Sequence, residues 1–325
     1  MKLTTGLLVA TALFATAGTA LASETKEISV GLIVTTSEAE TLKNWQPFLD
    51  DMSKKLGMKV TGYASKNYSD IIDGMKQGKV QVAWLGAKSA LQAVVEANGE
   101  VFVRHIKADG SKGYSALLLT HNGSGIASLD QVISSPGKYS YANGKPTSTS
   151  GFLLPNYYVF TKNEIDPKKH FKSIVTGSHQ DNFLAVAAGK VDIATNNTDD
   201  FDDFKNKYPS EYAKVKVLWK SEPVGLDPML YDKRLPADTK QKLARFFIDY
   251  GKGGVEERKN LLQAYDLKGF ERSTNMQLKR IADLEMFNEQ YSLMVDDSVT
   301  AEQKDKRFRE INQKYREIQR LLGSG

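Results

Sequence analysis

Hydrophobic and polar positions follow two spacings in turn along this chain, which predicts alternating strands and helices. The β-branched run from Ile28 to Thr35 predicts a strand. From Glu40 to Leu56 the apolar residues lie three or four apart, which predicts a helix that Gly57 ends in a left-handed conformation. The alternation continues with strands at 59–64, 80–85 and 101–106 and helices at 68–77 and 88–98. We therefore expect a mostly parallel sheet with helices on both faces.

A second α/β unit is predicted after the strand from Tyr114 to Thr120. The polar segment His121–Gly125 has the composition of a crossover or hinge. It is followed by expected strands at 139–142, 172–176, 191–195 and 215–219, and by helices after Ser148 and at 181–188. Asp227 and Pro228 mark the expected return crossover, after which a strand at 229–231 and helices at 238–250 and 256–265 rejoin the first unit. Two crossovers predict a hinged clamshell that holds its ligand between two lobes.

The domain boundaries follow from these crossovers. Lobe 1 is expected over residues 23–120 and 227–272, lobe 2 over 121–226, and a C-terminal helical extension over 273–325. The extension carries a narrow apolar seam at spacings of three and four, formed by Phe308, Ile311, Tyr315, Ile318 and Leu322. Such a seam either packs on its own lobe or forms a homodimer contact.

The N-terminus predicts secretion. Lys2 precedes an apolar run, Leu7 to Ala15, and small residues end at Ala22, which is the pattern of a signal peptide over residues 1–22. The chain has no cysteine, so we expect no lipid anchor on cysteine, no disulfide and no thiol catalysis. We expect a periplasmic protein of about 300 mature residues, a length that favours two cores over one.

Charge and histidine spacing exclude several function classes. The 44 Lys and Arg residues and 39 Asp and Glu residues are interspersed and leave a net charge of +5, so we expect no nucleic-acid partner. The four histidines, His105, His121, His170 and His179, show no metal-binding spacing. We expect neither a metal nor another cofactor.

A hydroxyl-rich turn is the strongest candidate for ligand binding. Ser148, Thr149 and Ser150 directly precede an apolar, helical-looking run. The N–H groups of a first helical turn attract anions, and three adjacent hydroxyls can surround a tetrahedral oxyanion. A simple helix cap would need only one of these hydroxyls. His179, between a predicted strand and a helix, could donate a hydrogen bond to the same oxyanion or could be a surface residue.

Two carboxylates and two tyrosines complete the candidate site. Asp199 follows a predicted strand, and Asp227 lies at the return crossover, where carboxylates would suit an ammonium group. As single residues they would be a helix cap and a turn former. Tyr68 and Tyr114 could close on a ligand through ring and hydroxyl, or could pack in the core. Together, the hydroxyl-rich turn and the carboxylates predict a zwitterionic ligand.

Two other classes of function remain open from the residues alone. A secreted hydrolase could use Ser148 or Ser150 with His179 and Asp199, but no Gly-x-Ser-x-Gly elbow frames either serine. A scaffold or sensor domain could dock through the C-terminal helix without any ligand. Within the clamshell class, phosphate, phosphite or methylphosphonate could replace a zwitterion, although two carboxylates disfavour a phosphate dianion.

Several motifs together resemble the periplasmic phosphonate-binding proteins of ABC transporters, over nearly the whole mature chain. The motifs are Trp45-Gln46-Pro47-Phe48-Leu49, Tyr68 with Ile71-Ile72-x-Gly74-Met75, Val82-Ala83-Trp84, Ala108-Asp109-Gly110-Ser111-x-Gly113-Tyr114, Ser148-Thr149-Ser150-Gly151-Phe152 and Ala194-Thr195-Asn196-Asn197-Thr198. The resemblance implies a type II periplasmic binding fold, closure of two lobes on the ligand, and delivery to a membrane permease. It also implies dimerisation through the C-terminal helices.

The resemblance assigns a role to each candidate residue. It implies that Ser148, Thr149 and Ser150 grip phosphonate oxygens with help from Tyr114 and His179. It implies that Asp199, Asp227 and Tyr68 meet the amino group of 2-aminoethylphosphonate. This chain differs from the family at two positions, because the family carries glutamate in place of Asp199 and tyrosine in place of Leu85. The shorter Asp199 would weaken the ammonium contact, admit water or suit a different amine.

Overall fold

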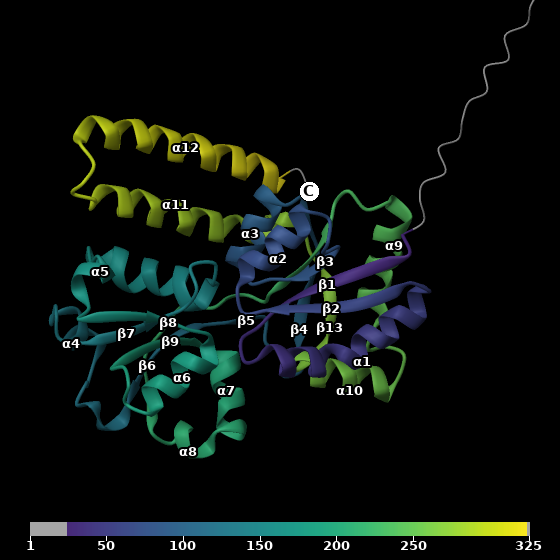
Figure 1. The fold of residues 1–325 in the computed structure, drawn as a ribbon, viewed down its shortest axis with the longest axis horizontal. Helices are drawn as coiled ribbons and strands as arrows, with labels where there is room; N and C mark the ends of the chain where they lie inside the picture. Colours follow the sequence, from purple (N-terminus) through teal and green to yellow (C-terminus); the bar gives the residue numbers. More distant parts are fainter. Residues whose placement is uncertain (1–24, 324–325) are drawn as a thin grey trace, which may run out of the picture.

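The computed structural model describes residues 25–323, which form two α/β lobes beside a hairpin of two C-terminal helices (Figure 1). The signal peptide predicted for residues 1–22 lies outside the described residues. None of the helices in the described part of the chain is long and apolar enough to cross a membrane.

Lobe 1 is built on a six-stranded sheet in the order β13-β4-β12-β3-β1-β2. Its strands are β1 (Glu27–Ile33), β2 (Lys59–Ser65), β3 (Val82–Trp84), β4 (Gly99–Lys107), β12 (Pro228–Asp232) and β13 (Leu267–Arg272). Its helices are α1 (Glu38–Leu56), α2 (Tyr68–Lys76), α3 (Ala87–Glu96), α9 (Ala237–Asp249) and α10 (Val255–Tyr265). The strand and helix order agrees with the periodicity of the sequence except at β13, which was not predicted.

Helix α1 shows how local sequence sets these elements. Its N-terminus is capped by Ser37, whose side chain accepts a hydrogen bond from the Glu40 amide, and it ends at Gly57 with φ of 65°. Its buried face includes Trp45 and Phe48, which are at most 1% exposed. Burial of these two rings stabilises lobe 1, since each aromatic side chain removes a large apolar area from water.

Lobe 2 is built on a five-stranded sheet in the order β10-β6-β9-β7-β8. Its strands are β6 (Ala116–His121), β7 (Ser140–Asn143), β8 (Ser173–Thr176), β9 (Ile193–Asn197) and β10 (Val215–Lys220). Its helices are α4 (Leu129–Ile133), α5 (Pro167–His170), α6 (His179–Ala187), α7 (Thr198–Lys207) and α8 (Pro209–Tyr212). Shorter helical turns are η1 (Asn122–Ser124), η2 (Thr149–Leu153), η3 (Asn156–Phe160) and η4 (Thr161–Asn163). Separate apolar clusters cover the two faces of this sheet.

The two-lobed α/β fold is confirmed, but the sheets are mixed rather than mostly parallel. In lobe 1, β1 pairs in parallel with β2 and β3, whereas β12 runs antiparallel to β3 and β4, and β13 runs antiparallel to β4. In lobe 2, β7 is parallel to β8 and β9, whereas β6 is antiparallel to β9 and β10. The reason is topological: β6 and β12 each enter their lobe from the interlobe side, where β9 and β3 end.

The first crossover between the lobes was misplaced in the sequence prediction. β6 pairs with β9 and β10, so residues 116–120 belong to lobe 2, and His121–Gly125 runs from the last residue of β6 through η1, at the far end of that lobe. The actual crossover is β5 (Gly113–Tyr114), which pairs antiparallel with β11 (Val224–Gly225) on the return path. Asp227 follows that return strand closely.

The C-terminal hairpin contacts both lobes. After η5 (Asn275–Leu278), helices α11 (Lys279–Met294) and α12 (Ala301–Gly323) pack side by side (Figure 1). α11 contacts α3 of lobe 1 and η2 and η3 of lobe 2. Its Asn288 donates to the Leu153 carbonyl at 3.2 Å and accepts from the Thr161 hydroxyl at 2.8 Å, while its Glu285 pairs with Lys88 of α3. The hairpin therefore ties the lobes together in this closed arrangement.

The apolar seam of α12 is used inside the chain. Tyr315, Ile318 and Leu322 are buried in the main apolar cluster of lobe 1, and Ile311 packs against it. The seam thus packs on its own lobe, which was one of the two interpretations of its spacing.

Candidate ligand-binding site

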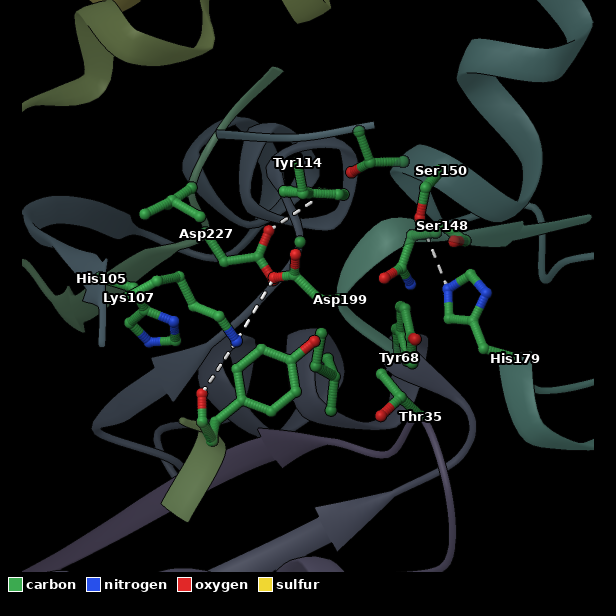
Figure 2. A pocket seen from close by; sticks show the side chains of 16 residues that line it. Thr35, Tyr68, His105, Lys107, Tyr114, Ser148, Ser150, His179, Asp199 and Asp227 are labelled. Atoms are coloured by element: carbon green, nitrogen blue, oxygen red, sulfur yellow. Dashed lines mark hydrogen bonds and ion pairs between the residues drawn. The ribbon is translucent and has the colours of Figure 1, made fainter. Parts of the chain in front are cut away.

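A small cavity lies between the two lobes, and all eight predicted site residues line it (Figure 2). It has a volume of about 30 Å³. The predicted residues are Tyr68, Tyr114, Ser148, Thr149, Ser150, His179, Asp199 and Asp227. The other lining residues are Ile33, Thr35, Gly86, His105, Lys107, Asn197, Leu226 and Tyr265. Residues far apart in the sequence therefore meet at one site, although their individual roles stay predictions.

Five helical N-termini converge on the cavity. Tyr68 and His179 are the first residues of α2 and α6, and Gly86, Ser148 and Asn197 immediately precede α3, η2 and α7. Each N-terminus carries backbone N–H donors and a partial positive charge. Their convergence makes the cavity attractive to an anion without any arginine.

The hydroxyl turn forms the lobe 2 wall of this cavity. The Ser148 hydroxyl caps η2 by accepting from the Gly151 amide at 3.0 Å, and Ser150 lies 3.5 Å from Nε2 of His179. Thr149 reaches across the cleft, where its oxygen accepts from the Lys88 amide of α3 at 2.9 Å. Gly86 does not cap α3 with a side chain, so Thr149 supplies that cap from the other lobe. Thr149 therefore stabilises the closed arrangement as well as lining the site.

The turn depends on a close approach of two glycines. A Cβ on Gly144 would lie 2.6 Å from Cα of Gly151 and 2.7 Å from its carbonyl carbon, so the backbone would have to shift. We expect Gly144→Ala to lower the free energy of unfolding by about 1–3 kcal/mol and to weaken ligand binding, as measured by urea unfolding and titration. Gly225→Ala is the matched control, because no atom lies within 4 Å of its added Cβ. Equal effects of the two changes would contradict this account of the turn.

His179 is a neutral hydrogen-bonding group in the cavity wall. Its side chain is 6% exposed, and burial lowers its pKa below the ordinary value for histidine. Its Nδ1 has no hydrogen-bond partner among the described residues. A neutral imidazole carries one N–H, which can donate to an oxyanion.

Asp227 lies in the cavity wall on the lobe 1 side. Its Oδ2 accepts from Nε1 of Trp84 and its Oδ1 accepts from the Tyr114 hydroxyl, both at 3.1 Å. Burial raises the pKa of Asp227 to about 7, and these two hydrogen bonds only partly oppose the increase. A buried carboxylate held in this way has a strong need for a cation.

Asp199 already has a cation beside it. Its Oδ2 lies 3.5 Å from Nζ of Lys107, which is the last residue of β4. Burial raises the pKa of Asp199, and the charge of Lys107 opposes this effect. The sequence predicts Asp199 as a contact for a ligand ammonium group, and in this structure it also has an internal partner.

Lys107, Trp84, His105 and Tyr265 were not predicted from the sequence to be site residues. A signal for two of them exists in β4, where Val101, Val103, His105 and Lys107 are buried at alternate positions. Polar residues that continue the buried face of a strand need partners inside the protein. Burial lowers the pKa of His105 to about 3, so this ring is neutral. Leu85, at the position where the family carries tyrosine, is buried but does not line the cavity.

A clamshell that encloses an anion-attracting cavity between its lobes defines a solute-binding protein. Residues 30–278 match the family model for the periplasmic phosphonate substrate-binding protein of ABC transporters. The chain is 39% identical over 296 residues to the phosphonates-binding periplasmic protein of Escherichia coli (strain K12), covering 91% of this chain and 87% of that protein. The chain therefore belongs to the family of phosphonate-binding periplasmic proteins of ABC transporters.

Solved structures agree with this assignment. The crystal structure of a binding-protein component of an ABC phosphonate transporter from Pseudomonas aeruginosa has a TM-score of 0.85 and 35% identity, covering 93% of this chain and 99% of that one. A protein of Prochlorococcus marinus (MIT 9301), solved with methylphosphonate, has a TM-score of 0.72 and 19% identity, covering 80% and 97%. The fold is the type II periplasmic binding protein fold. The protein is the periplasmic phosphonate-binding component of an ABC importer and is not an enzyme.

Proposed function

We propose that this protein captures 2-aminoethylphosphonate between its lobes and delivers it to the permease of its transporter. The proposal is supported mainly by the presence of anion-binding donors and a buried carboxylate in the same cavity. A hydroxyl turn with converging helix N-termini faces the buried carboxylate of Asp227. An oxyanion and an ammonium group on one short molecule satisfy both walls.

The phosphonate group would bind at the lobe 2 wall. Ser148 and Ser150 would donate their hydroxyls, and His179 would donate from its neutral ring. Tyr114 is placed between the two ends, because its hydroxyl contacts Thr149 and donates to Asp227. It would therefore orient Asp227 as well as border the phosphonate. Hydrogen bonds from these neutral donors would hold a phosphonate dianion and still allow its release to the permease.

The ammonium group would bind at Asp227, with Asp199 and Tyr68 nearby. Burial is the main cause of the raised pKa of Asp227, and the negative charge of Asp199 raises it further. Burial raises the pKa of Tyr68 too, and the charge of Asp227 adds to that increase. A cationic ligand group relieves this repulsion, whereas inorganic phosphate would add to it. This difference favours an aminophosphonate over phosphate, phosphite or methylphosphonate.

Calorimetric titration of residues 23–325 tests the proposal. We expect 2-aminoethylphosphonate to bind most tightly, methylphosphonate more weakly, and inorganic phosphate at least about tenfold more weakly than the amino compound. Equal or tighter binding of phosphate would overturn the aminophosphonate assignment and leave a simple oxyanion as the ligand.

Export and oligomeric state are further parts of the proposal. Cleavage after Ala22 would give a secreted protein that begins at Ser23, which the mass of the periplasmic product can test. A homodimer stays a prediction. Because Tyr315, Ile318 and Leu322 are buried within the chain, a dimer would have to use other residues of the hairpin. Sedimentation of the mature protein decides between monomer and dimer.

A further inference from the structure

A buried lysine, Lys107, lines the cavity beside the carboxylate of Asp199. Lys107 ends β4, and its side chain is only 9% exposed. It lines the same cavity as Asp199 and Asp227. A buried ammonium group needs charged and hydrogen-bonding partners, because transfer out of water is costly.

Three contacts hold the Lys107 ammonium group at this position, and Figure 2 shows it beside Asp199. Nζ lies 3.5 Å from Oδ2 of Asp199 and donates to the carbonyl oxygen of Tyr265 at 3.1 Å. It also lies 4.3 Å from the centroid of the Tyr265 ring, within the range of a cation–π contact. The Lys107 ammonium group is thus held at Asp199 by groups of the protein itself.

The pairing changes the charge that a ligand meets. Two carboxylates, Asp199 and Asp227, line the cavity, and Lys107 is the one lysine or arginine among the lining residues within the described part of the chain. Lys107 neutralises Asp199 and leaves Asp227, which accepts hydrogen bonds from the neutral side chains of Trp84 and Tyr114. A ligand ammonium group can therefore pair with Asp227, whereas at Asp199 it would meet the like charge of Lys107.

We infer that Lys107 is a specificity-determining residue that competes with the ammonium group of the ligand for Asp199. Resting on the proposed function, this inference defines the ligand class more closely. The site prefers short aminoalkylphosphonates through Asp227 alone, and it also accepts alkylphosphonates without an amine, because Asp199 is not left unpaired when they bind. Removal of the Lys107 charge would leave Asp199 free to pair with the ligand, and the site would then select more strongly for phosphonates that carry an amine over those that do not.

Lys107→Met tests the inference through a ratio of two affinities. The dissociation constants of ethylphosphonate and 2-aminoethylphosphonate are measured by calorimetry, since these ligands differ by the amino group. The ratio of the dissociation constant of ethylphosphonate to that of 2-aminoethylphosphonate is expected to increase by about tenfold in Lys107→Met. The reason is that the ligand ammonium group gains Asp199 as a partner and loses a repulsive neighbour. Lys88→Met is the matched control, because Lys88 is similarly buried and ion-paired with Glu285 but does not line the cavity. Its ratio should stay at the wild-type value.

Two further variants keep the test decisive if Lys107→Met folds poorly. Lys107→Gln keeps a donor for the Tyr265 carbonyl and removes the charge, so its ratio should also increase. Asp199→Asn in the wild-type background leaves Lys107 without its counter-ion and should lower the ratio by several-fold. In a Lys107→Met background, Asp199→Asn should cancel the increase, which completes a double-mutant cycle.

The outcomes separate this inference from the proposed function. A wild-type protein that binds neither phosphonate overturns the proposed function. A wild-type protein that binds both, with ratios unchanged within twofold in the folded Lys107 and Asp199 variants, overturns only the role of Lys107. Ratios that move in opposite directions for Lys107→Met and Asp199→Asn support it.

Discussion

Replacement of Asp227 by asparagine is expected to weaken binding of 2-aminoethylphosphonate by about 100-fold and, at the same time, to raise the melting temperature of the ligand-free protein. Both effects have the same origin. The Asp227 carboxylate is buried with hydrogen bonds but without a cation of its own among the described residues, so it favours a cationic ligand and destabilises the empty protein.

The substitution is structurally conservative. In Asp227→Asn, the new side-chain oxygen can accept from the Trp84 indole in place of Oδ2, and the new amide group can donate to the Tyr114 oxygen in place of Oδ1 accepting. The binding loss should therefore be selective. Affinity for ethylphosphonate should stay the same or increase, because that ligand brings no ammonium group. Asp266→Asn, at an exposed position that does not line the cavity, controls for the change in net charge.

The stability gain has a defined pH dependence. Because the pKa of Asp227 is raised to about 7, the folded protein keeps a proton between about pH 4 and pH 7 that the unfolded chain has lost. The contribution of this group to the free energy of unfolding of the ligand-free protein therefore falls as the pH rises through that window. Asp227→Asn removes the penalty, so the melting temperature at pH 7.5 should increase by roughly 3–6 °C. No gain in calorimetric scanning would show that Asp227 does not destabilise the empty site.

Ligand selectivity should change with pH in the opposite direction. An ammonium group binds the ionised carboxylate, so the preference for 2-aminoethylphosphonate over ethylphosphonate should decrease as the pH falls from about 8 to about 6. The two phosphonate groups titrate at different pH values, because the ammonium group of 2-aminoethylphosphonate lowers its second phosphonate pKa. The wild-type ratio is therefore divided by the Asp227→Asn ratio at each pH, which removes this contribution of the ligands. A quotient that does not change with pH would assign the dependence to another group.

Loss of the hydroxyl turn should weaken every phosphonate alike. In the double variant Ser148→Ala/Ser150→Ala, the cavity loses two donors at its lobe 2 wall, and the Gly151 amide loses its cap. Each missing hydrogen bond to a charged group costs about 1.5–3 kcal/mol. We therefore expect affinities for 2-aminoethylphosphonate, ethylphosphonate and methylphosphonate to decrease by at least about 100-fold, with their ratios preserved.

The control for this variant is Thr147→Val, in the same turn but outside the cavity lining. It should bind like the wild type. The double variant should fold, because loss of a helix cap costs about 1 kcal/mol, and circular dichroism can verify this. A loss confined to the amino compound would mean that the ligand binds in the reverse orientation, with its ammonium group at the serines.

The meeting of the candidate residues at one cavity could be predicted because several of them lie where strands end and helices begin. Such positions carry short polar side chains for local reasons, and in an α/β clamshell they face the cleft. Thus Ser148, His179 and Asp199 could be selected from their place in the strand–helix alternation. Their roles in binding are not visible in the spacing and came from the resemblance to the family.

The contacts between lobes could not be predicted, because they join residues with no local relationship. Thr149 caps α3 in the other lobe, and Lys107 pairs with Asp199 across the cleft. The first crossover was misplaced because β6 reads as a continuation of lobe 1, and only strand pairing shows that it belongs to lobe 2. The same lack of pairing information made the sheets look mostly parallel.

A crystal structure of the mature protein with 2-aminoethylphosphonate would show directly how the ligand is held. We expect closed lobes, phosphonate oxygens within hydrogen-bond distance of Ser148 and Ser150, and the amino nitrogen within hydrogen-bond distance of the Asp227 carboxylate. A phosphonate bound at Asp227, an amino group that points away from it, or a ligand bound outside the interlobe cavity would contradict the proposed binding mode.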